Sequence, residues 1–64
     1  MKYEVGDTWF RIHPSFKELV VALSDKDFAI WFWNAYESET PKIIGMEEVV
    51  RSMREYKNQW SKIA

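Results

Sequence analysis

Few side chains in this sequence are suited to acid–base or metal chemistry. His13 is the only histidine, and the proline that follows it biases it towards an extended turn conformation. The absence of cysteine excludes a thiolate nucleophile, a thiolate metal site and a disulfide. The run Asp25-Lys26-Asp27 begins like a calcium-binding loop, but the rest of that spacing is missing, which favours a solvated hairpin turn. We therefore expect a protein that is not an enzyme and that binds no metal or cofactor.

Aromatic side chains are the abundant chemistry of the chain, with 4 Trp, 4 Phe and 3 Tyr among 64 residues. A chain of this length buries only about 60% of the surface that its unfolded form exposes, so its core is thin. Rings that do not fit into such a core lie at the surface. There, tryptophan is enriched in protein-binding hot spots and can also stack on nucleic-acid bases. The function therefore depends on where the secondary structure places the tryptophans.

The charge balance is close to neutral, with 9 Lys and Arg against 10 Asp and Glu. This balance disfavours a dedicated nucleic-acid binder and a strongly acidic DNA mimic. The longest uninterrupted apolar run, Phe28 to Trp33, is too short to cross a bilayer, and the first residues lack the apolar segment of a signal peptide. We expect one soluble, unprocessed domain over residues 1–64. We expect it in the cytoplasm, because a chain without cysteine needs no oxidising compartment.

Before Pro41, short alternating runs of β-branched and aromatic residues predict an antiparallel meander. Its strands are expected at about 8–13, 18–23 and 28–36, with turn-forming residues between them. Residues 42–44 offer a short fourth strand. The sheet is therefore expected to contain three to four strands.

After Gly45 the apolar residues recur every three or four positions instead. They are Met46, Val49, Val50, Met53, Tyr56, Trp60 and Ile63. This spacing predicts one amphipathic helix over about 46–62, and Glu47 and Glu48 in its first turn complement the helix dipole. The expected fold class is α+β: a small antiparallel β-meander followed by one C-terminal amphipathic α-helix packed on one sheet face.

The turns predict which residues share a face of the sheet. Two-residue turns after each of the first two strands, the second at 25–26, set Arg11 opposite Glu18 and Leu23 opposite Phe28. The face expected to pack against the helix then carries seven apolar residues: Phe10, Leu19, Val21, Leu23, Phe28, Ile30 and Phe32.

The opposite face of this predicted sheet has no helix to cover it. The same register places six candidate binding residues there: Trp9, Arg11, Glu18, Val20, Trp31 and Trp33. A half-solvated antiparallel sheet is usually polar on its free side, and a large exposed apolar area usually marks an interaction site. We predict that this face binds a partner or a second copy of the chain. The alternatives are that the tryptophans pack among themselves or that the segment around Tyr3 and Val5 covers them.

The leading functional hypothesis is a small protein–protein interaction module that uses this aromatic face. Its small size and lack of a catalytic pair suit an inhibitor or adaptor of the phage or mobile-element type, which would bind a host protein. A homodimer through the same face is compatible with this hypothesis. The alternative is a single-stranded nucleic-acid-binding protein in which the tryptophans stack on bases while Arg11 and Lys17 contact phosphates.

Overall fold

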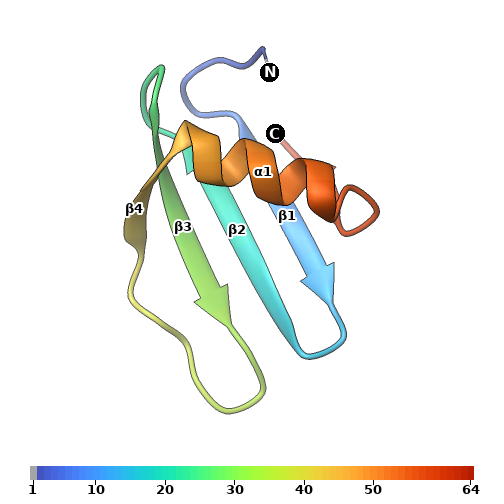
Figure 1. The fold of residues 1–64 in the computed structure, drawn as a ribbon. Coiled ribbons are helices and arrows are strands. Elements are labelled where there is room, and N and C mark those ends of the chain that lie inside the picture. Colours follow the sequence, from blue (N-terminus) through green and yellow to red (C-terminus); the bar gives the residue numbers. More distant parts are fainter. Residues whose placement is uncertain (1) are drawn as a thin grey trace.

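The computed structural model describes residues 2–64 and shows one helix and an antiparallel sheet of five strands (Figure 1). The elements in chain order are β1 (Thr8–His13), β2 (Phe16–Ala22), β3 (Asp27–Trp33), β4 (Lys42–Gly45), α1 (Met46–Glu55) and β5 (Trp60–Lys62). Across the sheet the strand order is β4-β3-β2-β1-β5, so the last strand returns to the edge beside the first. The predicted α+β class with an antiparallel sheet is confirmed.

The meander strands lie close to their predicted positions. β1 has the predicted bounds, whereas β2 and β3 begin earlier than predicted and β3 ends at Trp33 instead of residue 36. Asn34 ends β3 because its side-chain oxygen accepts the N–H groups of Tyr36 and Glu37 at 2.8 and 2.9 Å, which turns the chain. The optional strand at 42–44 is present as β4.

The C-terminal part of the chain corrects the prediction of a helix over 46–62. Helix α1 ends at Glu55, and the chain then reverses through a tight turn in which the Gln59 N–H donates to the Tyr56 carbonyl at 2.8 Å. Trp60–Lys62 pair with β1 as β5. This pairing fills backbone hydrogen bonds that β1 would otherwise leave open at the sheet edge. The sheet therefore has five strands instead of three to four, and the helix lies between two strands instead of at the C-terminus.

Helix α1 lies across the strands on one face of the sheet, which we call the covered face (Figure 1). The buried residues between them form one hydrophobic cluster: Trp9, Val20, Ala22, Phe28 and Val49. Phe28 is completely buried, and Val20 and Val49 are each 1% exposed. The apolar stripe of the helix therefore packs against β1, β2 and β3, as its spacing requires.

The register of the β2–β3 hairpin differs by one residue from the prediction. Ala22, not Leu23, is the residue opposite Phe28. The turn consists of three residues, 24–26, instead of the predicted two, 25–26, and it is closed by the Leu23 N–H, which donates to the Asp27 carbonyl at 2.9 Å. Ser24 stabilises this longer connection because its hydroxyl accepts the N–H groups two and three residues ahead.

This slip of one residue moves the side chains of β1 and β2 to the opposite faces of the sheet relative to those of β3, because successive side chains of a strand point to opposite faces. The β1–β2 register and the predicted faces of β3 are correct. On β1 and β2 the predicted faces are wrong: Phe10, Leu19 and Val21 lie on the face away from α1. Their places against the helix are taken by Trp9, Arg11, Glu18, Val20 and Ala22.

The N-terminal segment also packs on the covered face. The Tyr3 ring lies 5.0 Å from the Phe28 ring and 6.2 Å from the Trp9 ring, measured between centroids, and its hydroxyl donates to the Ser24 carbonyl at 3.0 Å. Gly6 allows the reversal before β1 because it adopts a positive φ of 95°. The alternative that this segment covers the tryptophans is therefore correct for Trp9 and wrong for Trp31 and Trp33, which lie on the other face.

Asp7 anchors this N-terminal turn to β5, the edge strand beside β1. Its carboxylate accepts the Glu4 N–H at 2.9 Å and lies 3.3 Å from the Lys62 ammonium. The Glu4 hydrogen bond, aided by Lys62, holds the pKa of Asp7 below its ordinary value of 3.8.

The lowered Asp7 pKa predicts a stabilisation that is lost in acid. The carboxylate stabilises the fold fully above pH 3.8, and this contribution disappears as the pH falls through the lower folded-state pKa. Thermal unfolding of wild type and Asp7→Asn should differ at neutral pH and converge as the pH falls through the lowered folded-state pKa of Asp7. Lys62→Met should reduce the wild-type advantage at neutral pH, and Lys57→Met should not. A constant offset between wild type and Asp7→Asn across this range would contradict the assignment.

Candidate functional site

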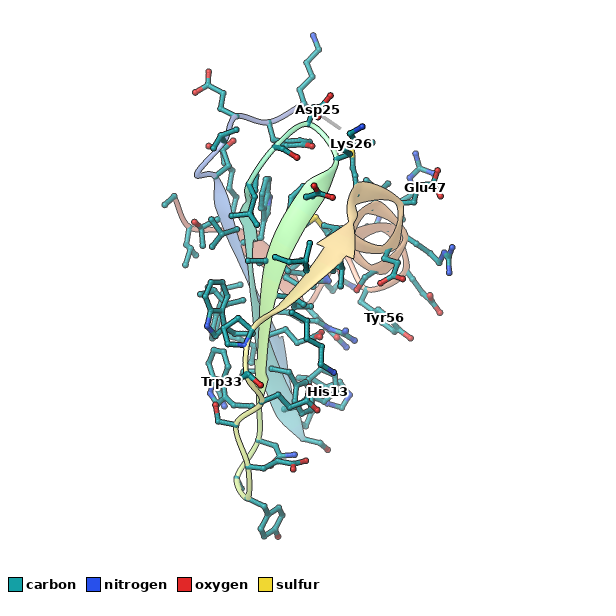
Figure 2. The ribbon with its side chains drawn as sticks, turned by 90° about the vertical axis from the view of Figure 1, so that its left-hand side faces the viewer. His13, Asp25, Lys26, Trp33, Glu47 and Tyr56 are labelled. Carbon is teal, nitrogen blue, oxygen red and sulfur yellow. The ribbon has the colours of Figure 1, made fainter. Side chains whose placement is uncertain are left out.

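The six residues predicted to form one binding face lie on two different faces. Trp31 and Trp33 face away from the helix. The other four lie on the covered face: Trp9, Arg11, Glu18 and Val20. In Figure 2, Trp33 lies on one side of the sheet, whereas His13 and Tyr56 lie on the side of the helix. The predicted grouping is wrong because it depended on the two-residue turn that the chain does not form.

Arg11 is buried and is held by two polar side chains. Its Nη1 donates to Glu18 Oε1 at 2.8 Å, and its Nε donates to Gln59 Oε1 at 2.7 Å. The two charged side chains are only 10% and 16% exposed. Arg11 on β1 is therefore bonded to Glu18 on β2 and to Gln59 in the turn that leads from α1 into β5.

Three aromatic rings complete the surroundings of the Arg11 guanidinium. Its central carbon lies 4.2 Å from the Tyr56 ring centroid, 4.9 Å from that of Phe16 and 6.0 Å from that of Trp60. A cation in such a position is stabilised by the electron-rich ring faces. Because the guanidinium is already paired and enclosed, Arg11 offers no free cation to a phosphate.

A cavity of about 170 Å³ lies between α1 and the sheet beside this ion pair, with Glu48 and Ser52 on its helix side. Every buried side-chain nitrogen or oxygen within residues 2–64 has a hydrogen-bond partner. Trp60, for example, donates its indole N–H to the Ser52 hydroxyl at 3.1 Å. The hydrogen bonds of Arg11, Glu18 and Trp60 around the cavity are thus made within the fold.

We call the sheet face that points away from α1 the open face. Strand pairing arranges its side chains in three rows across β1, β2 and β3. The basic row is Ile12, Lys17 and Trp33, the bulky row is Phe10, Leu19 and Trp31, and the small row is Thr8, Val21 and Ala29. Beyond the small row, strand alternation places Asp27 on the same side of β3.

The open face is apolar although no helix of the described chain lies on it. Ile12 and Ile43 are 59% and 64% exposed, and all members of the bulky row are half-buried. The Phe10 and Trp33 rings are in contact, with centroids 5.8 Å apart. Lys17 is the single charged residue in the three rows. Such a face resembles one side of a protein core more than the solvated side of an antiparallel sheet.

Sequence reasoning missed Phe10, Leu19 and Val21 as candidate site residues because it assigned them to the core. Their alternation with Trp9 and Val20 was visible in the sequence, but alternation alone does not say which set a helix will cover. The available signal was Ser24, since a serine hydroxyl that accepts N–H groups ahead of it favours a longer turn. With that turn, the faces of β1 and β2 would have been assigned correctly.

His13 is the last residue of β1 and pairs with Phe16 beside the β1–β2 turn, so the prediction that it lies in the turn itself is wrong. Its Nδ1 accepts the Ser15 N–H at 3.0 Å, and its ring stacks on Phe16 with centroids 4.3 Å apart. Among the side chains that the structure describes, no three of His, Asp or Glu gather as metal ligands. The helix in the described part of the chain is too short and too polar to cross a membrane.

No protein-family model, curated protein or solved structure matches this chain. The function is therefore argued from the site, because a fold alone does not define a function.

Proposed function

We propose that the chain is a non-enzymatic protein-binding module whose open face is buried by a protein partner. The observation that carries this proposal is the set of aromatic and branched side chains that the bulky row and Trp33 present on the side away from α1. A contiguous apolar surface of this kind is costly to leave in water and usually marks an interaction site. Trp31 and Trp33 are the expected anchors, because tryptophan is one of the residue types enriched in hot spots.

The nucleic-acid alternative receives less support from this geometry. Of the three tryptophans expected to stack on bases, Trp9 is only 8% exposed beneath the helix. Of the two cations expected at phosphates, Arg11 is paired with Glu18 on the covered face. Only Lys17 remains to contact phosphate within the three rows. One cation provides little of the counterion release on which single-strand binding depends.

The proposal predicts that partner binding depends on the open-face tryptophans. Trp31→Ala and Trp33→Ala should each weaken binding at least about tenfold, as expected for hot-spot residues. Tyr36→Ala is the matched control, because Tyr36 is 96% exposed in the loop between β3 and β4. The tagged chain would be used to capture proteins from source cells, and the affinity of each purified candidate would then be measured with wild type and all three variants.

Two outcomes would refute the proposal. One is a partner that binds wild type and the Trp31→Ala/Trp33→Ala double variant equally well while both remain folded. The other is quenching of tryptophan fluorescence by a single-stranded oligonucleotide that disappears as salt rises, which would favour nucleic-acid binding instead. The role as inhibitor or adaptor stays a prediction from the sequence until the partner is known.

A further inference from the structure

We propose that the partner of the open face is a second copy of this chain, packed face to face about a two-fold axis that runs across the strands. This inference rests on the proposed function, since it names the protein that buries the same face. In a two-fold dimer the same surface is used by both copies and must therefore complement itself. The open face has this property in both shape and charge.

The shape complementarity comes from the order of the rows. Along the strands the open face runs from the basic row through the bulky row and the small row, and alternation along β3 adds Asp27 at the far end. A two-fold axis across the strands reverses their direction in the partner, so its rows are met in the opposite order. Each bulky row then lies over the small row of the other copy. Facing sheets pack about 10 Å apart when large side chains on one side meet small side chains on the other.

The charge complementarity follows from the same operation. Lys17 lies at one end of the open face and Asp27 at the other. Reversal of the strands therefore brings Lys17 of each copy to the end that carries Asp27 in its partner. Neither carboxylate nor ammonium forms an ion pair within residues 2–64, where the three pairs involve other residues.

A two-fold axis parallel to the strands would give the opposite result. It would place each bulky row on the other bulky row and bring the two Lys17 side chains to the same end. Like charges that meet in an interface cost affinity, and two bulky rows would hold the sheets apart and leave gaps. The self-complementary arrangement is therefore the one in which the strands of the two copies are antiparallel across the interface.

The size of the chain also favours a second copy. A sheet with one helix buries only one of its faces, and a chain of 64 residues has little apolar core to stabilise it. Packing two open faces together would convert Trp31, Trp33 and their neighbours from surface into core. A formal net charge of −1 on each chain causes little repulsion between the copies.

Charge reversal with sedimentation equilibrium tests the proposal. Wild type should show a monomer–dimer equilibrium between micromolar and millimolar concentration. Lys17→Asp and Asp27→Lys should each raise the dissociation constant about tenfold, because each variant places like charges together. The double variant Lys17→Asp/Asp27→Lys should return to within about threefold of wild type. Lys57→Asp, an exposed change in the turn after α1, is the control that should have no effect.

The outcomes separate this proposal from the broader one. A wild-type chain that stays monomeric over the whole range overturns the second-copy proposal. A dimer that Trp31→Ala does not weaken, or one that the double reversal does not rescue, overturns it as well. In each of these cases a different captured protein that depends on Trp31 and Trp33 would still support the proposed protein-binding function. Circular dichroism on every variant excludes unfolding as the reason for a lost dimer.

Discussion

Phe28→Ala is expected to destabilise the protein by about 3–5 kcal/mol, the usual range for removing a buried phenylalanine ring. Phe28 has no exposed surface and lies at the centre of the hydrophobic cluster beneath α1. Its ring also contacts those of Tyr3 and Trp9, with centroids 5.0 and 6.0 Å apart. The variant would therefore lose packing from the helix side, the sheet and the N-terminal segment at once.

This loss is large compared with the expected total stability. A domain of 64 residues has a free energy of unfolding of roughly 3–10 kcal/mol. Urea unfolding followed by circular dichroism should therefore show Phe28→Ala to be largely unfolded or to have a much lower midpoint. Trp31→Ala is the matched aromatic truncation on the open face and should cost clearly less in the monomer. If Trp31→Ala were the more destabilising of the two, the assignment of the covered face would be wrong.

Removing the carboxylate of the buried ion pair is the second large effect. Glu18→Ala should destabilise the protein by about 3 kcal/mol, since it leaves the enclosed Arg11 guanidinium without its counter-charge. This value is the lower end of the usual range, because the hydrogen bond from Arg11 to Gln59 and the contact with Tyr56 remain. Urea unfolding at neutral pH would measure the difference.

Two further variants identify the cause of this loss. Glu39→Ala breaks an ion pair with Lys42 whose side chains are 41% and 67% exposed, and it should cost less than about 1 kcal/mol. The double variant Arg11→Met/Glu18→Leu replaces the buried pair by apolar side chains and should recover most of the lost stability. Equal costs for Glu18→Ala and Glu39→Ala would mean that the Arg11 pair is no more important than a surface pair.

The elements with local signals were predictable from the sequence. β1 has the predicted bounds, and α1 begins at Met46 immediately after Gly45, with Glu47 and Glu48 in its first turn. The opposition of Arg11 and Glu18 across the first hairpin was also predicted correctly. Each of these features depends on residues close together in the chain, where turn preferences and residue spacing decide the conformation.

The end of the helix depended on a distant strand. The spacing of Trp60 and Ile63 continues the apolar stripe of α1, so the local pattern favours a longer helix. In the structure β1 offers a free edge, and Arg11 pairs with Trp60 across it. The strand pairing gained there connects residues about fifty positions apart in the sequence. The spacing of neighbouring residues contains no information about hydrogen bonds to a distant strand. Helix propensity therefore did not predict β5.

Alternation along each strand shows which of its residues share a face. The number of aromatic residues shows that one helix cannot cover all of the rings. Which faces came together was decided only in the tertiary structure. One extra residue in the turn that Ser24 stabilises brought Trp9 and Arg11 under α1 and left Phe10 beside Trp33 on the open face. The physical reason is the two-residue period of a strand, in which a slip of one position exchanges the two faces completely.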